Sequence, residues 1–291
     1  MTTRQRRTSR ARIGAARVCL ALMAVVLGLD GEQPAHARGL KVLYNFAGSS
    51  DGGDPYASLI RDSAGNLYGT ADYGGTAFAG AVFKVAPDGI ETVLYSFSGG
   101  ADGAQPFCAL VRDKAGNLYG VTAFGGADDE GAVYEIAKDG TFSTLHSFSG
   151  GTDGGFLYGG LAIDKEGNLI GSTVSGGANG QGTVFVLEPD GTLLTVYNFT
   201  GGTDGGGPEG DMLLKGASLY STVTSGGDEA CNCGGVYEVT SKAREKMLHP
   251  FTAATGDNYS AGLTAKGGTF YGTTQSGGSA GLGVVFSLTK K

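Results

Sequence analysis

An internal repeat of about 51 residues, present five times, constrains this chain more than any other feature. Each copy has a β-like run that closes on an aromatic residue, and successive copies are 51, 51, 51 and 52 residues apart. The closing aromatics are Phe46, Phe97, Phe148, Phe199 and Phe251. A small supersecondary unit repeated at such a period predicts a radial or solenoid array.

One copy of the repeat contains four short apolar runs separated by turns rich in Gly and Asp. In the second copy these runs are Thr92–Phe97, Phe107–Arg112, Leu118–Ala123 and Ala132–Ala137. Short β-branched and aromatic runs bounded by Gly and Asp are typical of strands joined by hairpins. Four strands per repeat predict an all-β, five-bladed β-propeller. The competing interpretation is a linear β-solenoid, which needs caps at both ends.

The phase of the repeat predicts how the propeller closes. The first recognisable strand, Lys41–Phe46, matches the last strand of a blade, and the final run, Val284–Leu288, matches the third. We therefore expect Lys41–Phe46 to pair with Val284–Leu288 and to remove the free edge of the last blade. The repeat units are about 41–91, 92–142, 143–193, 194–245 and 246–291.

The first 37 residues have the pattern of a secretory signal peptide. Six arginines precede or flank the start of an apolar run over 18–29, and Ala35-His36-Ala37 forms a small-residue cleavage motif. We expect residues 38–291 to form a single exported domain, secreted or periplasmic. Removing six arginines and two acidic residues takes the net charge from −7 to −11. This acidity argues against nucleic acid and anionic membranes as partners. No later segment approaches a transmembrane span, so we expect no membrane insertion, and we expect a monomer.

Several motifs resemble a known family of repeats. LYSFSGGADGAQP begins at Leu94, RDKAGNLYGVT at Arg112 and GAVYEI at Gly131. These segments resemble the GloVer-type tandem repeat of exported bacterial proteins described as choice-of-anchor. The resemblance covers about 250 residues, implies an exported repeat protein, and supplies no catalytic or ligand-binding residues.

Aromatic side chains are the main candidates for ligand binding. One set precedes the innermost strand of the repeats; it comprises Tyr56, Phe107 and Tyr158, with Glu209 at the fourth copy and Tyr259 at the fifth. A second set, Tyr73, Phe78 and Phe124, lies in loops where later repeats carry serine. Aromatic faces stack on sugars or anchor peptides. For the Tyr56 set, packing of large side chains between blades is the preferred role, and ligand binding is the alternative.

Carboxylates form two groups. The first sits in Asp-Gly turns at Asp51, Asp102, Asp153 and Asp204, with Asp257 as a shifted fifth copy, and suits turn formation better than cation binding. The second, Asp54, Glu209, Asp211 and Asp257, lies at the start of inner strands and would be needed by a glycosidase. The matching positions carry Gln105 and Phe156, so we predict no catalytic residues. The histidines replace tyrosine at one repeat position, and we predict no metal or cofactor.

Three cysteines remain after signal cleavage. Cys108 lies in an apolar run and is expected to be a buried thiol. Cys231 and Cys233 lie in a Gly-rich loop of the fourth repeat, where export favours a local disulfide.

Three classes of function fit these observations. The first is a non-catalytic module that binds a glycan or a protein through one face of the propeller. The second is a carbohydrate-active enzyme that uses the carboxylates of the channel. The third is a purely structural envelope protein.

Overall fold

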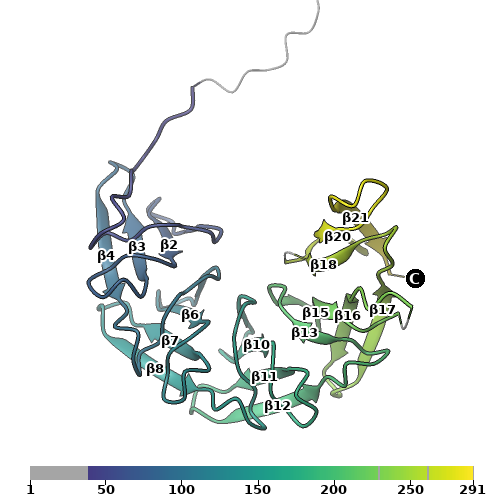
Figure 1. The fold of residues 1–291 in the computed structure, drawn as a ribbon. Coiled ribbons are helices and arrows are strands. Elements are labelled where there is room, and N and C mark those ends of the chain that lie inside the picture. The colour runs from purple at the N-terminus through teal and green to yellow at the C-terminus, as the bar shows by residue number, and fades with distance from the viewer. Residues whose placement is uncertain (1–38, 229, 261, 291) are drawn as a thin grey trace, which may run out of the picture. The chain divides into compact units, whose positions relative to one another are not determined.

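A computed structural model describes residues 39–228, 230–260 and 262–290 (Figure 1). The chain divides into two compact units, Met1–Val42 and Leu43–Lys291. The predicted signal peptide, 1–37, lies outside the described residues. The account below concerns the second unit.

The described part of this unit is all-β and contains no helix; consequently no helix there could cross a membrane. Its strands form five sheets, which we number 1 to 5 in chain order (Figure 1). Sheets 1 to 3 contain β1 (Ile60–Arg61), β2 (Leu67–Ala71), β3 (Ala81–Val85), β4 (Glu91–Ser96), β5 (Val111–Arg112), β6 (Leu118–Thr122), β7 (Ala132–Ile136), β8 (Phe142–Ser147), β9 (Ala162–Ile163), β10 (Leu169–Thr173), β11 (Thr183–Leu187) and β12 (Leu193–Asn198). Sheets 4 and 5 contain β13 (Gly206–Pro208), β14 (Leu213–Lys215), β15 (Ser218–Ser225), β16 (Gly235–Thr240), β17 (Glu245–Pro250), β18 (Asp257–Ser260), β19 (Thr264–Lys266), β20 (Thr269–Ser276) and β21 (Val284–Thr289).

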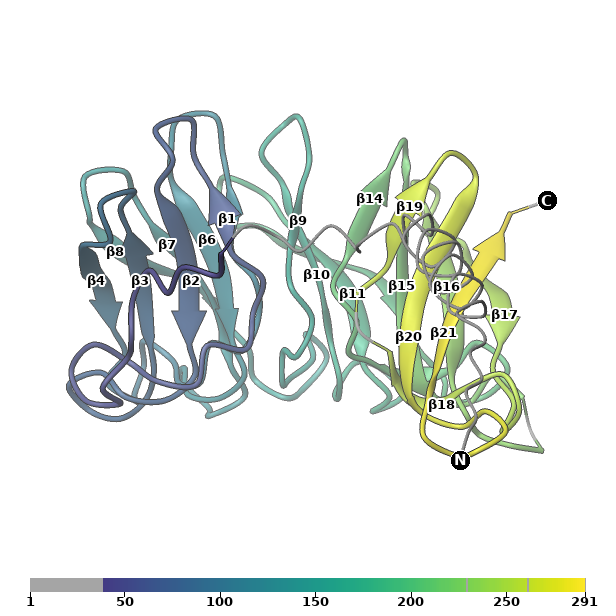
Figure 2. The ribbon, with the colours of Figure 1, turned by 90° about the horizontal axis from the view of Figure 1, so that it is seen from above.

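Each sheet is antiparallel, and in sheets 1 to 3 consecutive strands pair (Figure 2). Sheet 1 has the order β1-β2-β3-β4, and sheets 2 and 3 repeat it. In sheets 4 and 5 the innermost strand is split into two pieces that pair with the same neighbour. Four runs per repeat and propeller-like sheets were therefore predicted correctly.

The innermost strands are much shorter than the sequence predicts. The run Phe107–Arg112 forms a strand only at Val111–Arg112. Upstream, Gln105 has a φ of 56° and its carbonyl accepts a hydrogen bond from the Phe107 N–H at 3.0 Å, which turns the backbone. Cys108 and Leu110 are buried all the same. The apolar character of this run thus serves packing between sheets and not strand pairing.

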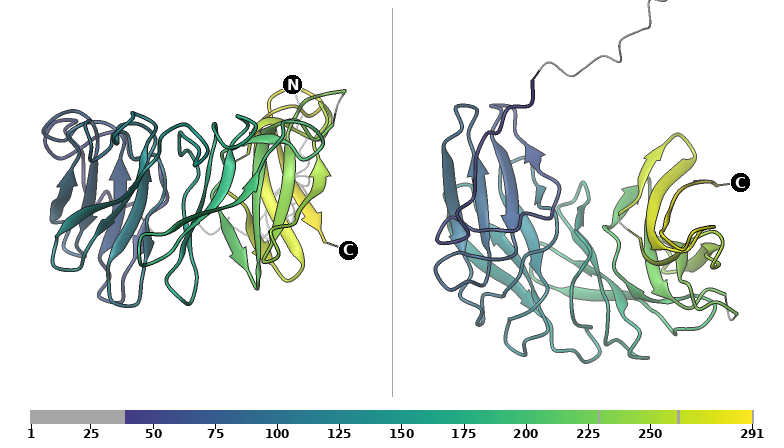
Figure 3. Two further views of the ribbon diagram at one scale, coloured as in Figure 1. Left: turned by 90° about the horizontal axis from the view of Figure 1, so that it is seen from below. Right: turned by 45° about the horizontal axis from the view of Figure 1, so that its top comes forward.

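The closing aromatic of each repeat lies in the core between one sheet and the next. Phe97, Phe148, Phe199 and Phe251 are all buried. Phe97 packs edge-on against Tyr134 of the following sheet, with ring centroids 5.1 Å apart, and Phe148 packs on Phe185 at the same distance. Successive sheets, which follow one another side by side in Figure 3, are therefore joined through ring contacts.

The second glycine of the GNLYG motif makes room for this packing. A Cβ on Gly69 would come within 2.6 Å of the Phe83 ring, and one on Gly120 would come equally close to the phenol of Tyr134. A side chain at either position would therefore displace the core aromatic.

The Asp-Gly series has a structural role. The Asp102 carboxylate accepts hydrogen bonds from the Ser98 N–H at 2.8 Å and from the Tyr95 hydroxyl at 3.0 Å. Burial opposes ionisation, but the hydrogen bonds from Ser98 and Tyr95 outweigh it, and the pKa of Asp102 is lowered. His146 takes the tyrosine's place beside Asp153 at 3.3 Å.

The fifth copy of this turn was misassigned. Asp257 lies in β18 and pairs with Ser276. Thr255 takes the structural position instead, because its hydroxyl accepts the Thr252 N–H at 2.9 Å and Gly256 follows it with φ of 143°. A threonine hydroxyl supplies the same backbone acceptor as a carboxylate, so the turn survives the loss of the Asp-Gly pair.

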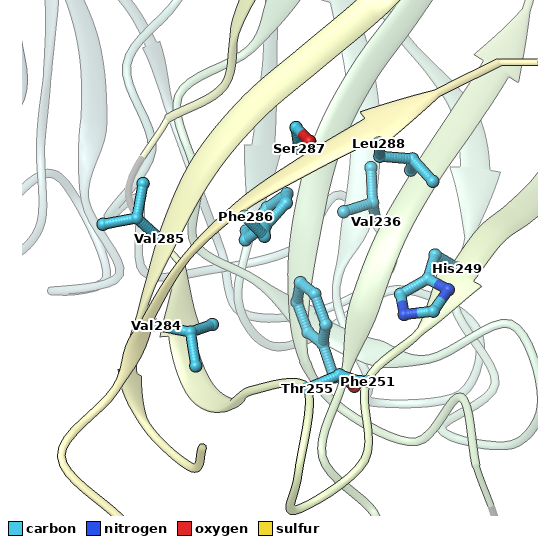
Figure 4. Close-up of a pocket in the computed structure, with 9 residues that line it drawn as sticks. All are labelled: Val236, His249, Phe251, Thr255, Val284, Val285, Phe286, Ser287 and Leu288. Carbon is cyan, nitrogen blue, oxygen red and sulfur yellow. The ribbon is translucent and has the colours of Figure 1, made fainter. Parts of the chain in front are cut away.

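The predicted closing pair is not formed in the described residues. There β21 pairs with β20 alone, and residues 41–46 form no strand. A pocket of about 330 Å³ lies beside the free edge of β21 and is lined by Phe286 and Leu288 together with His249 and Phe251 (Figure 4). Sheet 5 thus ends at its third strand, as the repeat phase predicts.

Candidate functional site

Five aromatic side chains from sheets 1 to 3 form a continuous row of ring contacts. We call this set the aromatic row; it comprises Tyr56, Phe107, Tyr158, Phe124 and Phe156. Ring centroids are 6.4 Å apart for Tyr56 and Phe107 and 5.9 Å apart for Phe107 and Tyr158. Phe124 lies 6.2 Å from Tyr158 and 5.5 Å from Phe156.

The row combines packing with an accessible surface. Tyr56 is 74% exposed, and Phe107, Phe124, Phe156 and Tyr158 are half-buried. Rings that touch each other lose little side-chain entropy when a ligand covers them, because their neighbours already hold them in place. Such a surface suits binding to an apolar or sugar face.

A left-handed backbone residue positions part of this row. Phe156 has a φ of 55°, and its N–H donates to the Glu130 carbonyl of the preceding sheet at 2.8 Å. Gln105 repeats the arrangement one sheet earlier, with φ of 56° and a bond from its N–H to the Ala79 carbonyl at 2.8 Å. Because positive φ strains residues other than glycine, the bond between sheets stabilises an unfavourable conformation.

Sequence reasoning missed Phe156 as a member of this row. It was considered only as a residue that replaces a carboxylate at the Asp54 position. Its signal was present in the repeat alignment: an aromatic residue stands two positions before Tyr158 where the other repeats carry Asp54, Gln105 and Gly207.

Tyr73 and Phe78 form a separate aromatic pair. Their ring centroids are 5.6 Å apart, and the side chains are 47% and 58% exposed. Tyr73 occupies the same repeat position as Phe124, since each forms an isolated bridge with the turn that precedes the inner strand. The structure therefore unites Phe124 with the Tyr56 set, and it joins Tyr73 to Phe78.

Glu209 follows the row in the fourth sheet. Its backbone carbonyl lies 3.1 Å from where a Cβ on Gly159 would stand, directly after Tyr158. Burial raises the pKa of Glu209 to about 7. Its buried Oε2 atom has no hydrogen-bond partner among the described residues.

The other carboxylates of this group have different surroundings. Asp211 accepts a hydrogen bond from the Gly160 N–H at 2.7 Å, which ties sheet 4 to sheet 3. Asp54 is exposed and has φ of 51°. Burial, and then the charge of Asp54, raise the pKa of Asp72, so Asp54 acts on a neighbour in its own sheet. Asp257 lies in β18.

The two loop cysteines, Cys231 and Cys233, are joined by a disulfide, with their Cα atoms 5.1 Å apart. Cys108 is a buried free thiol; burial, and then the charge of Asp211, raise its pKa. Among the residues that the structure describes, no group of three or more His, Cys, Asp or Glu side chains could hold a metal ion.

Comparison with solved structures finds several propeller-like neighbours at low identity. A gluconolactonase from Xanthomonas campestris is 15% identical, with 80% of this chain and 71% of that chain covered and a TM-score of 0.51. A luciferin-regenerating enzyme is 12% identical over 80% of this chain and 76% of its own, with a TM-score of 0.54. The tricorn protease is 15% identical with a TM-score of 0.50, and this chain spans about a fifth of its length, 21%. At such identities the likeness shows the fold alone.

No curated protein matches the sequence. A family model does: the Gloeobacter/Verrucomicrobia repeat matches residues 33–171 and again 138–291. These two overlapping matches cover nearly the whole of the repeat array and confirm the resemblance found in the motifs. The chain belongs to the Gloeobacter/Verrucomicrobia repeat family.

Proposed function

We propose that this protein is an exported, non-catalytic binding module that recognises a glycan or a protein through the aromatic row. The observation that carries the proposal is the continuous run of ring contacts that joins sheets 1 to 3. Every sheet needs its core aromatic, but Glu209 stands at the row's position in sheet 4. A feature that packing does not require in every copy is a candidate for recognition.

Binding energy should concentrate in the accessible rings. Covering each ring contributes on the order of 1–2 kcal/mol. Replacing Tyr56 and Phe124 together with alanine should therefore weaken binding by one to two orders of magnitude or so. Tyr271→Ala is the matched control, because Tyr271 is a partly exposed tyrosine of sheet 5, outside the row.

The experiment begins with glycan arrays and with pull-downs from cell-envelope fractions, using residues 38–291. The partner found is then titrated against the wild type, the double variant and the Tyr271→Ala control. An unchanged affinity in the double variant would exclude the aromatic row as the binding site.

A carbohydrate-active enzyme is the second candidate, and the raised pKa of Glu209 favours it. A carboxyl group with a pKa of about 7 can act as a general acid near neutral pH. The name of one structural neighbour, a gluconolactonase, suggests sugar chemistry, but at 15% identity it supports only the fold. Glycan turnover by the purified protein that disappears in Glu209→Gln would replace the binding proposal with this one.

We also infer that the five sheets close into a ring through residues 41–46 and β21. Tyr44 and Phe46 already have the geometry of a fourth strand: their rings meet edge-on at 5.1 Å, as those of Tyr95 and Phe97 do. Phe46 also packs on Phe83 at 4.8 Å, which repeats the contact of Phe97 with Tyr134. These ring contacts match those of the fourth strands in later sheets and so support the proposed closure.

Val285, the second residue of β21, supports closure. Its counterparts in sheets 1 to 4 are fully buried; they are Val82, Val133, Val184 and Val236. Val285 is 84% exposed. By the register of β3 with β4, where Val82 faces Tyr95, Val285 would face Tyr44 in the closed ring.

A further inference from the structure

Sheet 3 departs from the other sheets at one cross-strand pair. The second strand carries a tyrosine at this position in four sheets: Tyr68, Tyr119, Tyr220 and Tyr271. In sheet 3 the residue is Ile170. Its partner on the third strand is Val186, where sheets 1, 2 and 4 have the longer Lys84, Glu135 and Glu238.

In sheets 1 and 2 the tyrosine fills the space between neighbouring sheets. Tyr68 packs against the core cluster that sheet 1 shares with sheet 2, and Tyr119 against the cluster between sheets 2 and 3. The Tyr68 hydroxyl donates to Oδ2 of Asp62 at 3.0 Å, and the Tyr119 hydroxyl donates to Oδ2 of Asp113 at 3.3 Å. Each aspartate belongs to the hairpin turn that precedes its tyrosine.

Sheet 3 keeps the aspartate of this arrangement and lacks the tyrosine. Asp164 accepts the Asn168 N–H at 2.8 Å and the Asn168 side-chain amide at 2.7 Å, just as Asp62 does with Asn66. Among the described residues, Oδ2 of Asp164 accepts from Asn168 alone, where Oδ2 of Asp62 accepts from two side chains. One acceptor site of a fixed carboxylate is therefore left over.

The space above Ile170 is a pocket of about 470 Å³ between sheets 3 and 4. Its walls are aliphatic and its rim carries Asp164; the wall residues are Ile170, Val186, Val196, Leu214, Leu219 and Val239. This volume lies within the range of small-molecule sites, and apolar walls with one fixed polar group are typical of them. Leu214 and Leu219 belong to the short hairpin of β14 and β15.

We propose that this pocket binds a small para-substituted phenol, whose ring takes the place of the missing tyrosine and whose hydroxyl donates to Oδ2 of Asp164. The aliphatic walls accept the ring, and the carboxylate selects a ligand that donates a hydrogen bond. Asp164 and Glu166 outnumber Lys165 among the charged lining residues, so the net negative charge there disfavours ligands that carry a carboxylate. The site is separate from the aromatic row and independent of the function proposed for that row.

The probe is p-cresol, which is the side chain of tyrosine without its backbone, and toluene is the matched ligand without the hydroxyl. Binding to residues 38–291 is followed by calorimetry and by chemical-shift changes of the isoleucine, leucine and valine methyl groups. We expect p-cresol to bind at least tenfold more tightly than toluene. Bound toluene would shield Oδ2 of Asp164 from water and offer it no hydrogen bond, whereas the p-cresol hydroxyl donates one.

Ile170→Tyr is the decisive variant, because it restores the residue found in the other four sheets. It should abolish p-cresol binding and leave the fold intact or stabilise it, with methyl shifts otherwise unchanged. Asp164→Asn should bring the affinities for p-cresol and toluene within about threefold of each other. Tyr56→Ala, in the aromatic row, should leave p-cresol binding unchanged.

Each adverse result has a clear meaning. If a folded Ile170→Tyr variant binds p-cresol as the wild type does, the ligand lies elsewhere and the site is wrong. If toluene binds as tightly as p-cresol, Asp164 does not recognise the hydroxyl and the phenol assignment is wrong. Absence of binding at millimolar p-cresol overturns the proposal altogether.

Discussion

Sheets 1 to 3 and sheets 4 and 5 share the aromatic core between sheets but differ in the hairpin turns that surround it. The closing aromatic and its partner on the next sheet occur in both regions: Phe148 packs on Phe185, and Phe251 packs on Phe286 at 5.2 Å. The hairpin turns differ. An Asp–Asn turn such as Asp113 with Asn117 serves the first three sheets, whereas two residues, Gly216 and Ala217, make the turn in sheet 4.

This difference separates two kinds of requirement. A residue kept in all five copies, such as the core aromatic, is demanded by packing between sheets. A residue present in one region only, such as Tyr73 or Phe124, answers to something that the architecture does not need. The comparison therefore directs functional tests to the first three sheets and stability tests to the shared core.

The largest effect on stability is expected at the free edge of β21, where sheet 5 would meet the segment before sheet 1. Val285→Asp should lower the free energy of unfolding by several kcal/mol if the ring is closed, because the aspartate would take the place of a buried valine. In an open array the change would be nearly neutral, since Val285 is then exposed. Ile90→Asp, at an exposed turn of sheet 1, is the control.

Urea unfolding of residues 38–291 gives the measurement. Deleting residues 38–47 is the companion test: loss of the fourth strand should cause aggregation or a large drop in melting temperature. Unchanged melting in both variants would show that the ring does not close through this segment.

The next effect contrasts a shared aromatic with a region-specific one. Phe148→Ala should cost about 3–5 kcal/mol, since it leaves a cavity between sheets 2 and 3. Phe124→Ala should cost about 1 kcal/mol, because the ring is half-buried and lies at the surface of the array. Both values come from the same urea titration. Equal losses would mean that the aromatic row is structural and would weaken the case for recognition.

The sequence predicted the shared features well and the region-specific features poorly. Repeat spacing located Phe97 and Phe148, because packing between sheets imposes the same residue at the same interval. It could not show that Gln105 and Phe156 adopt positive φ, because that conformation depends on hydrogen bonds to the preceding sheet. Phe156 was therefore missed as a member of the aromatic row. For the same reason the inner strand of the second repeat was predicted four residues too long at its start.

Sheets 3 and 4 should also differ in their response to pH. Glu245 in sheet 4 stands where sheet 3 has Leu193, as the pairing of each residue with the third strand shows. Burial, and then the charge of Asp204, raise the pKa of Glu245 to about 7 from its usual 4.5. A raised pKa means that the folded state favours the neutral carboxyl. The stability from this group is thus present below about pH 4.5 and lost as pH rises through 7.

Glu245→Leu should remove this loss. We compare the free energy of unfolding of the variant with that of the wild type at two pH values. After allowance for solvent screening, the variant's advantage should be about 1 kcal/mol larger at pH 8 than at pH 4. Glu166→Leu, which changes an exposed carboxylate of sheet 3 to the same residue, is the control for the loss of a surface charge. Thermal melts from pH 4 to pH 8 measure both. A difference that is the same at both pH values would exclude ionisation of Glu245 as its cause.

The smallest effect concerns the turn that sheet 5 builds without an aspartate. Asp102→Thr imitates Thr255 and keeps an acceptor for the backbone, but it loses the charge-assisted bonds from Ser98 and Tyr95. We expect a loss of about 0.5–1 kcal/mol at pH 7. The pKa of Asp102 is lowered in the fold, so its contribution is present above the unfolded pKa and is lost as pH falls through the folded one. The variant and the wild type should therefore converge in stability as pH falls below the folded pKa of Asp102. A gap that persists there would show that the hydrogen-bonding geometry of the turn, and not the carboxylate's charge, distinguishes the first sheets from the last.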